Sequence, residues 1–211
     1  MMDRFGIQEV YGMHNWPGQP LGKFAIRPGP FFAATDQFDI TIKGQGGHAA
    51  KPHETVDSVV VAAHVVMALQ TIVSRNADPV EQAVVSVTSV ESSSKAFNVI
   101  AESVQLKGTI RTLTPEMRAL AEDRLRKLVD ATCLAYGANA VITYYKGYPP
   151  MVNHVAQTEF AAKVAADVSG SCDEAPLVMG GEDFAYMLEE RPGAYILVGN
   201  GGTAAVHNAA Y

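Results

Sequence analysis

The sequence has few cysteines and no cluster of basic residues, and each shortage excludes a class of protein. Its 211 residues contain two cysteines, Cys133 and Cys172, which share no short spacing. A disulfide framework is therefore excluded, the cytoplasm is the expected compartment, and both thiols are expected to be buried. The net charge of -6 and the absence of any run of Lys or Arg argue against nucleic acid as a partner.

Long apolar runs and several catalytic motifs are missing as well. The residues after Met1–Phe5 form no apolar core, so we expect no signal peptide. The most apolar run, Val59–Leu69, is interrupted by His64 and is shorter than the about 20 residues that span a bilayer, so we expect no membrane partner. There is no GxSxG elbow and no P-loop, and Gly199–Gly202 lacks the spacing of a dinucleotide fingerprint.

The composition, 48% hydrophobic and 18% charged, is typical of a globular chain. Apolar periodicity in the middle of the chain predicts an ordered series of elements. Strands are expected at Phe38–Lys43, Val84–Val90, Val104–Arg111 and Ala138–Lys146, and helices at about His53–Arg75 and from Pro115 to Gly137. This βαββαβ order predicts a ferredoxin-like unit, with two helices on one face of an antiparallel sheet.

The periodicity also predicts which side chains face the core of this unit. Thr114 is a plausible N-cap for the second helix, and Gly137 is placed to end it. The side chains expected to face inward from the strands are Phe38, Ile40, Ile42, Val104, Leu106 and Ile110. The expected inner stripe of the second helix is Met117, Leu120, Ala121, Leu125, Leu128, Thr132 and Ala135.

The two flanks of this unit are too poor in elements to bury a core separately. The first flank offers a strand at Glu9–His14 and a Pro/Gly-rich tract, and the second offers helices at Glu159–Val168 and Phe184–Glu189 and a strand at Ala194–Val198. We interpret residues 1–34 and 148–211 as one incomplete α/β domain, interrupted by an α+β domain at residues 35–147.

Histidines stand at three positions that favour a functional role. His48 lies in a Gly-rich turn, Gly44–His53, between a predicted strand and helix; an ordinary connecting loop explains such a turn equally well. His14 ends a predicted strand, and His207 follows a Gly/Ala-rich loop. A strand end suits a metal ligand, although a single histidine is more often structural, and a zinc site needs three or four protein ligands.

Three polar positions have two interpretations each. Arg111, on the polar face of its strand, is either solvated or a clamp for a carboxylate. Asn98 lies in a loop between strands and is either a turn residue or a ligand contact. Glu182 and Asp183 precede a predicted helix, where the helix dipole alone favours acidic residues; the functional alternative places them near a substrate or metal.

Taken together, these motifs resemble a known family. They are Gly12-Met13-His14-Asn15-Trp16-Pro17-Gly18, Gly46-Gly47-His48-Ala49-Ala50-Lys51-Pro52-His53, Asn98-Val99-Ile100, Gly108-Thr109-Ile110-Arg111, Gly180-Gly181-Glu182-Asp183-Phe184 and His207-Asn208. Their order resembles that of bacterial hippurate hydrolases and related N-acyl-amino-acid amidohydrolases, in the metallopeptidase family of aminoacylases and carboxypeptidase G. The resemblance covers essentially the whole chain.

The resemblance implies an amide hydrolase with two divalent metal ions, zinc, manganese or similar, in a catalytic domain that a ferredoxin-like lid interrupts. It implies that His14 and His207 are metal ligands and that His48 stabilises the tetrahedral intermediate, often across a dimer interface. It associates Asn98 and Arg111 with binding of the substrate carboxylate. The implied partners are an N-acyl amino acid or small peptide and a second copy bound through the lid. The role of Glu182 stays open.

One departure from the family pattern is large. A Cys-Gly-His-Asp segment and a Glu-Glu pair, which supply the other metal ligands and the general base in that subfamily, do not precede His14. We therefore expect the chain to be the C-terminal portion of such an enzyme and to be inactive alone. The alternatives are a non-catalytic lid that dimerises or binds a ligand, and a degenerate pseudoenzyme.

Overall fold

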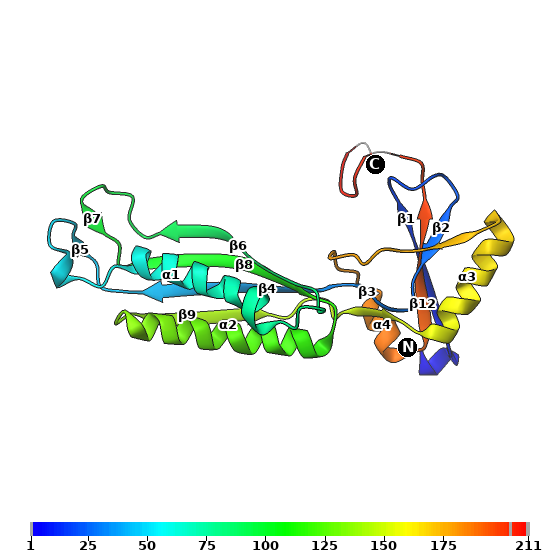
Figure 1. Ribbon diagram of the computed structural model, residues 1–211, viewed down its shortest axis with the longest axis horizontal. Helices are drawn as coiled ribbons and strands as arrows, with labels where there is room; N and C mark the ends of the chain where they lie inside the picture. The colour runs from blue at the N-terminus through cyan, green and yellow to red at the C-terminus, as the bar shows by residue number, and fades with distance from the viewer. Residues whose placement is uncertain (1, 203, 210–211) are drawn as a thin grey trace. The chain divides into compact units, whose positions relative to one another are not determined.

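The chain divides into two compact units, each with its own sheet and core. The computed structural model describes residues 2–202 and 204–209. Unit 1 consists of Met1–Ala33 and Tyr148–Tyr211, and unit 2 consists of Ala34–Gly147. Figure 1 labels the elements of both units.

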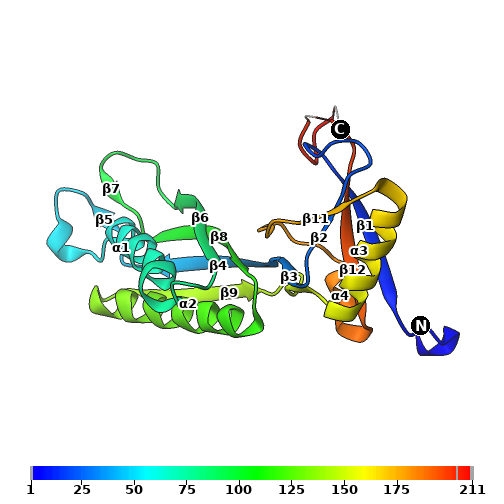
Figure 2. The ribbon, with the colours of Figure 1, turned by 45° about the vertical axis from the view of Figure 1, so that its right-hand side comes forward.

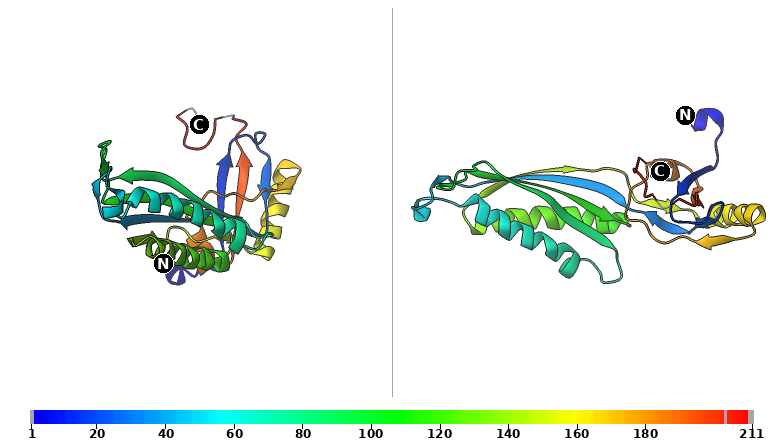
Figure 3. Two further views of the ribbon diagram at one scale, coloured as in Figure 1. Left: turned by 60° about the vertical axis from the view of Figure 1, so that its left-hand side comes forward. Right: turned by 90° about the horizontal axis from the view of Figure 1, so that it is seen from above.

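Unit 2 is built on a four-stranded antiparallel sheet. Its elements are β4 (Ala34–Lys43), β5 (Gly47–His48), α1 (Ser58–Thr71), β6 (Ala83–Ser92), β7 (Val99–Ile100), β8 (Ser103–Thr112), α2 (Pro115–Ala135) and β9 (Asn139–Tyr145). The sheet order is β6-β8-β4-β9, and each neighbouring pair is antiparallel. Figure 3 shows α1 and α2 on the same side of this sheet. The short strands β5 and β7 pair with each other at one end of the unit (Figure 1).

The core of unit 2 lies between this sheet and the two helices, and its strand residues were correctly predicted. Phe38, Ile40 and Ile42 of β4 are buried, as are Val104, Leu106 and Ile110 of β8. The alternation of each strand therefore assigns its faces correctly, because successive side chains point to opposite sides of a sheet.

The helix boundaries and the inner stripe of α2 differ in part from the prediction. Thr114 caps α2 as expected, since its hydroxyl accepts from the Met117 amide. Helix α1 begins at Ser58 instead of near His53, because Asp57 accepts from two amides of the first turn. The preceding Pro52–Glu54 forms a 3-10 turn. The buried stripe of α2 is Met117, Ala121, Leu125, Val129 and Cys133. Of the predicted stripe, Leu120, Leu128 and Thr132 are half-buried and Ala135 is exposed. Ala135 was therefore predicted wrongly, because the buried positions recur every fourth residue.

The apolar run in α1 is longer than the sequence indicated. A π-helical turn, Ile72–Asn76, continues the helix. Residues Ser58–Asn76 are, by length and composition alone, long and apolar enough to cross a membrane, so the expectation of too short a run is wrong. Val61, Val65 and Leu69 on this helix pack into the core of unit 2. We interpret it as a core helix, for which a high apolar content is ordinary.

Unit 1 contains a mixed sheet and a smaller strand pair. Its elements are β1 (Val10–Trp16), β2 (Phe24–Ile26), β3 (Gly29–Phe32), β10 (Met151–Asn153), α3 (Val155–Ser169), β11 (Cys172–Glu174), α4 (Ala185–Glu190) and β12 (Gly193–Gly199), after a 3-10 turn at Asp3–Phe5. The sheet order is β1-β12-β2-β11. Strands β1 and β12 are parallel, β2 is antiparallel to β12, and β3 pairs with β10.

Several strands of unit 1 were not predicted. Strands β2, β3, β10 and β11 have three or four residues each, which is too short for a period of two to be recognised. Strand β1 extends to Trp16, so His14 lies inside the strand instead of ending it. Cys133 is buried as expected, but Cys172 is only half-buried because it lies on β11, the last strand of the sheet order.

The two faces of β1 point to different surroundings. Gly12, His14 and Trp16 share one face with the core of unit 1, in which Phe32, Tyr195 and Leu197 are buried. Tyr11 and Met13 share the other face, where helix α3 contributes Phe160 and its neighbours to an apolar hollow. Figure 2 shows α3 running alongside the strands of this sheet.

Candidate functional site

His14 is held in one orientation near the carboxyl end of β1, two residues before Trp16. Its Nδ1 lies 2.5 Å from the carbonyl oxygen of Asn15. A carbonyl oxygen only accepts, so in the neutral ring Nδ1 carries the proton and Nε2 keeps its lone pair. An imidazole with one nitrogen bonded to a carbonyl and the other free is the usual state of a metal ligand.

Aromatic contacts support the ring of His14. The indole of Trp16 meets it edge to face, with ring centroids 5.6 Å apart. Trp16 in turn contacts Phe32, and Phe32 contacts the ring of Tyr195, each at 5.9 Å. Because these rings are packed against the core, they restrict where the half-buried His14 can point.

Tyr195 and Glu182 form a polar pair on the same face of the sheet. The Tyr195 hydroxyl donates to Glu182 Oε2 at 2.8 Å, and the Phe184 amide donates to Oε1 at 3.4 Å. Burial and this hydrogen bond raise the pKa of the Tyr195 hydroxyl far above its usual range. A Cβ at Gly12 would lie 2.6 Å from the Tyr195 ring. Glu182, whose role the sequence left open, thus fixes Tyr195 and the residues just before α4.

His207 follows the neighbouring strand. Strands β1 and β12 are parallel, and His14 is level with Leu197. The segments that follow the two strands therefore leave the sheet at the same edge. The segment after β12 stays beside β1, since the Asn200 amide donates to the Trp16 carbonyl and the Gly18 amide to the Gly202 carbonyl. The carboxyl edge of parallel strands is where open sheets bind their ligands. His207 itself is exposed, with a positive φ of 65°.

The described residues do not assemble a metal site on their own. No group of three or more His, Cys, Asp or Glu side chains that could hold an ion is present in residues 2–202 and 204–209. His14 and His207 have the donor chemistry that zinc and manganese accept, but two imidazoles fall short of the three protein ligands of a catalytic zinc. The histidines therefore supply at most part of a metal site.

His48 and Asn98 are brought together at one end of unit 2. His48, on β5, is level with Val99 of β7, and the Ala49 amide donates to the Asn98 carbonyl at 3.0 Å. Both side chains are exposed. The Ala50 amide donates to His48 Nδ1 at 3.1 Å, so the neutral ring carries its proton on Nε2 and presents a hydrogen-bond donor to solvent.

Arg111 lies on β8 of the four-stranded sheet, at the end of unit 2 opposite β5 and β7. It is level with Thr35 at the start of β4. A strand rises about 3.4 Å per residue, which puts Arg111 about 27 Å from the start of β8 at Ser103. Arg111 lines an open hollow of about 280 Å³ with Lys107 and Thr109. No hydrogen bond or ion pair joins its guanidinium to another residue that the structure describes.

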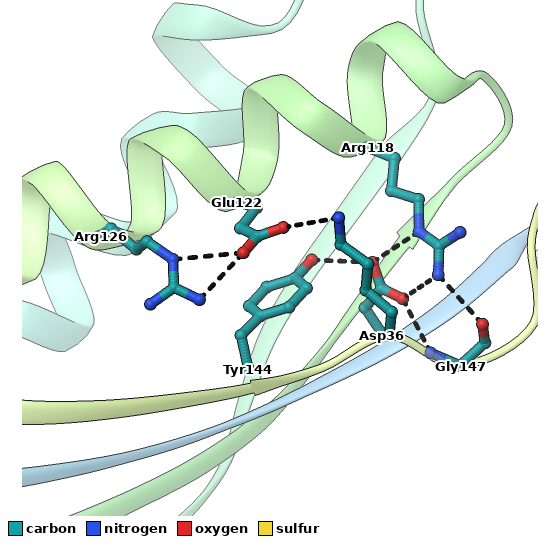
Figure 4. Close-up of polar contacts among 7 residues, drawn as sticks. Asp36, Arg118, Glu122, Arg126, Tyr144 and Gly147 are labelled. Atoms are coloured by element: carbon teal, nitrogen blue, oxygen red, sulfur yellow. Dashed lines mark hydrogen bonds and ion pairs between the residues drawn. The ribbon is translucent and has the colours of Figure 1, made fainter.

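Sequence reasoning missed three contributors to these arrangements. Trp16 and Tyr195 were not singled out, and only their contacts in the fold identify them. The third, Asp36, lies at the centre of a buried polar network (Figure 4). A signal for Asp36 was available, because the alternation that buries Phe38, Ile40 and Ile42 extends back to position 36, where a buried aspartate needs a partner.

Comparison with known proteins identifies the family that this chain matches. Residues 1–211 match peptidase family M20/M25/M40. The chain is 34% identical to N-acetylcysteine deacetylase of Bacillus subtilis over 206 residues, which cover 98% of the chain and 54% of that protein. It is 35% identical to thermostable carboxypeptidase 1 of Saccharolobus solfataricus over 195 residues, 92% of the chain and 49% of that protein. The chain thus spans about half the length of these curated relatives.

Solved structures agree with the sequence comparison. The YXEP protein of Bacillus subtilis, whose structure is described as that of a dinuclear metal-binding peptidase of the M20 family, superimposes with a TM-score of 0.80 and 30% identity. The match covers 96% of this chain and 51% of that one. The mixed α/β fold is therefore that of M20 peptidase structures, and the chain belongs to peptidase family M20/M25/M40.

Proposed function

We propose that this chain is part of a metal-dependent amidohydrolase that cleaves the amide bond of N-acyl amino acids, hippurate-like compounds among them, or of small peptides. The observation that carries the proposal is His14, whose Nδ1 is engaged and whose Nε2 is free, at the sheet edge from which the His207 loop also departs. The relatives named as a deacetylase and a carboxypeptidase share one reaction, the hydrolysis of an amide bond.

In this proposal the two units have different tasks. Unit 1 is the C-terminal part of the catalytic domain, which the sequence predicted at residues 1–34 and 148–211. Unit 2, which begins at Ala34, one residue before the predicted range of 35–147, is a ferredoxin-like lid. The support for a ferredoxin-like lid is its sheet order, β9-β4-β8-β6, with both helices on one face, which is the arrangement expected of a βαββαβ chain.

A divalent metal, zinc, manganese or similar, would be held by His14 and His207 together with ligands from outside this chain. When bound, such an ion supplies a Lewis acid and lowers the pKa of a bound water. The general base would also come from outside the chain. Residues 1–211 alone are therefore expected to hold no binuclear centre and to hydrolyse no N-acyl amino acid.

His48 would donate a hydrogen bond to the oxygen of the scissile carbonyl as negative charge develops on it. The structure supports this role through the Ala50 amide, which occupies Nδ1 and leaves the proton on Nε2. A donor fixed before the reaction stabilises an oxyanion without reorganisation. Glycines at positions 44, 46 and 47 leave little side-chain bulk around the ring.

Arg111 and Asn98 would both bind substrate carboxylates, but one unit does not bring them to one small ligand. About 27 Å of strand β8 separates Arg111 from the end of the sheet near Asn98 and His48. An N-acyl amino acid is far shorter than this distance. We therefore propose a homodimer through the lid, in which His48 and Asn98 of one copy serve a site to which the other copy contributes Arg111.

A non-catalytic module is the rival function. The observation that favours it is the lack of a metal-binding group of three among the described residues, which a lid that only dimerises or a degenerate pseudoenzyme would share. The rival predicts that joining this chain to the unmatched half of a relative produces neither metal binding nor amide hydrolysis.

A chimera separates the two functions. The half of the Bacillus subtilis deacetylase that lies outside the match is joined to residues 1–211, and the His14→Ala form of the same chimera is the control. We expect the chimera to bind divalent metal and to hydrolyse N-acyl amino acids above the control, and the 211-residue chain to do neither. Turnover of hippurate by the 211-residue chain above its own His14→Ala control would contradict the proposal.

A further inference from the structure

Asp36 carries a buried carboxylate in unit 2 that the proposed chemistry does not use. Its side chain is 1% exposed, and four donors converge on it (Figure 4). Arg118 donates from Nε to Oδ2 at 2.9 Å and from Nη2 to Oδ1 at 2.6 Å. The Tyr144 hydroxyl donates to Oδ2 at 2.8 Å, and the Gly147 amide donates to Oδ1 at 3.1 Å.

Stability alone is a poor explanation for this network. Burying two opposite charges costs both of them their hydration, and apolar residues of similar size often stabilise a fold equally well. A two-pronged guanidinium–carboxylate pair does provide a fixed direction for each donor, which apolar packing does not. The network is therefore best explained by what it holds in place.

The network joins three segments that are distant in the sequence. Asp36 lies at the start of β4, Arg118 in the first turn of α2, and Gly147 just after β9. Arg118 also donates from Nη2 to the Gly147 carbonyl at 3.0 Å. A Cβ at position 147 would lie 1.9 Å from the carbonyl oxygen of Thr35. The chain that leaves unit 2 is thus pressed against the strand that enters it.

The same segment of β4 supports Arg111. Thr35 is level with Arg111 in the β4–β8 pairing, one residue from Asp36. The carbonyl of Asp36 accepts a hydrogen bond from the Thr109 hydroxyl at 2.8 Å. The carboxylate of Asp36 faces the helices, while Arg111 lies on the other face of the sheet. Fixing Asp36 therefore fixes the backbone on which Arg111 is carried.

We propose that Asp36 is a positioning residue, whose carboxylate holds the start of β4, the first turn of α2 and the exit at Gly147 together and so presents Arg111 in one place. The link to Arg111 rests on its proposed role in binding a carboxylate. The positioning itself does not, and a test without substrate keeps the two proposals separate.

Hydrogen exchange of single backbone amides in the 211-residue chain tests the proposal. The variant is Asp36→Asn, and the matched control is Glu122→Gln, another carboxylate-to-amide change. The Glu122 carboxylate contacts Arg126 and Lys146 beside the Asp36 network (Figure 4). We expect Asp36→Asn to speed amide exchange at Gly147, Thr35 and Arg111 by about tenfold or more. Exchange at Ile40 and Leu106, in the middle of the sheet, should rise by less than about threefold. The control should leave Gly147 unchanged.

Two outcomes overturn the proposal: unchanged exchange at Gly147, or a uniform increase throughout unit 2, which indicates a merely stabilising ion pair. If Asp36→Asn does not fold, Arg118→Lys replaces it. Lysine keeps the charge but replaces the two guanidinium nitrogens with one ammonium nitrogen, so the two-pronged geometry toward the Asp36 carboxylate is lost. The same local increase is therefore expected. Tyr144→Phe, which leaves both Gly147 contacts intact, should change exchange at Gly147 less than Asp36→Asn or Arg118→Lys does.

Discussion

The two units differ in how completely they cover their apolar side chains. In unit 2, two helices close one face of the sheet, and the largest core side chains, such as Ile40 and Leu125, are fully buried. In unit 1, one helix lies along the corresponding face, and Tyr11, Met13 and Phe160 stay 43%, 62% and 59% exposed. These three side chains line one apolar hollow between β1 and α3.

From this contrast we expect unit 2 to fold independently and unit 1 to be the less stable part of the chain. Strand pairing does not distinguish the units, because each four-stranded sheet has two edge strands, β6 and β9 in unit 2 and β1 and β11 in unit 1; the difference lies in how the helices cover the sheets. The candidate metal ligands, His14 and His207, are both in unit 1. The unit with the more complete core therefore carries His48, Asn98 and Arg111, and the unit with the less complete core carries the candidate metal ligands.

The largest expected difference between the units is in folding itself. A fragment of residues 34–147 should unfold in one cooperative urea transition, with coincident circular dichroism and fluorescence, because its core is closed. In the 211-residue chain, unit 1 should unfold at lower urea in a separate transition. A disordered fragment by circular dichroism would show that the boundary or the independence of unit 2 is wrong.

Single side chains should show the same contrast. Leu125→Ala removes a fully buried leucine of α2 and should lower the free energy of unfolding of unit 2 by about 2–5 kcal/mol, the usual cost of such a cavity. Phe160→Ala removes a mostly exposed ring of α3 and should change the stability of unit 1 by less than about 1 kcal/mol. Urea unfolding of both variants measures the difference, and equal losses would contradict the contrast.

The histidines of the two units should separate catalysis from metal binding. In the chimera with the deacetylase half, His48→Ala should lower kcat by about 10²–10³, the usual loss for one oxyanion donor, with little change in KM. Its metal content should be unchanged. His14→Ala should lower metal occupancy, measured by elemental analysis of the purified protein. The reverse pattern, with metal lost only on replacing His48, would show that the two roles were assigned wrongly.

The sequence predicted unit 2 better than unit 1, for a physical reason. Long amphipathic strands such as β8 repeat their pattern often enough to reveal both element and face, and Thr114 signals the start of α2. In unit 1 the three-residue strands β2 and β11 follow no readable period, and pairing with distant neighbours alone makes them strands. The mixed sheet of unit 1 could therefore be predicted only in part from the sequence.

The site residues show the same limit. Motifs indicated His14, His48 and Arg111 as candidates, but no pattern in the sequence shows that about 27 Å of strand β8 separates Arg111 from the His48 end of the sheet. That separation follows from strand length and register. The Tyr195–Glu182 pair also depends on register, which places Tyr195 opposite Gly12.

The smallest expected effect is a pH dependence confined to unit 2. Burial alone would raise the pKa of the Asp36 carboxyl, but the hydrogen bonds from Arg118, Tyr144 and the Gly147 amide outweigh it, so this pKa lies below its usual range. In the unfolded chain an aspartate carboxyl has a pKa of about 3.9. The folded state thus releases its proton more readily than the unfolded state. Asp36 therefore stabilises the fold above about pH 4, and this contribution is lost as the pH falls from about 4 through the folded pKa.

Urea midpoints of the 34–147 fragment from pH 7 to pH 2 should fall more steeply below about pH 4 in the natural sequence than in Asp36→Asn. The difference between the two should be constant between about pH 5 and 7. Asp123→Asn, which alters an exposed carboxylate on α2 paired with Lys127, is the control and should keep the natural slope. Parallel curves for Asp36→Asn and the natural sequence at every pH would mean that the Asp36 carboxylate gains nothing from its charge in the folded state.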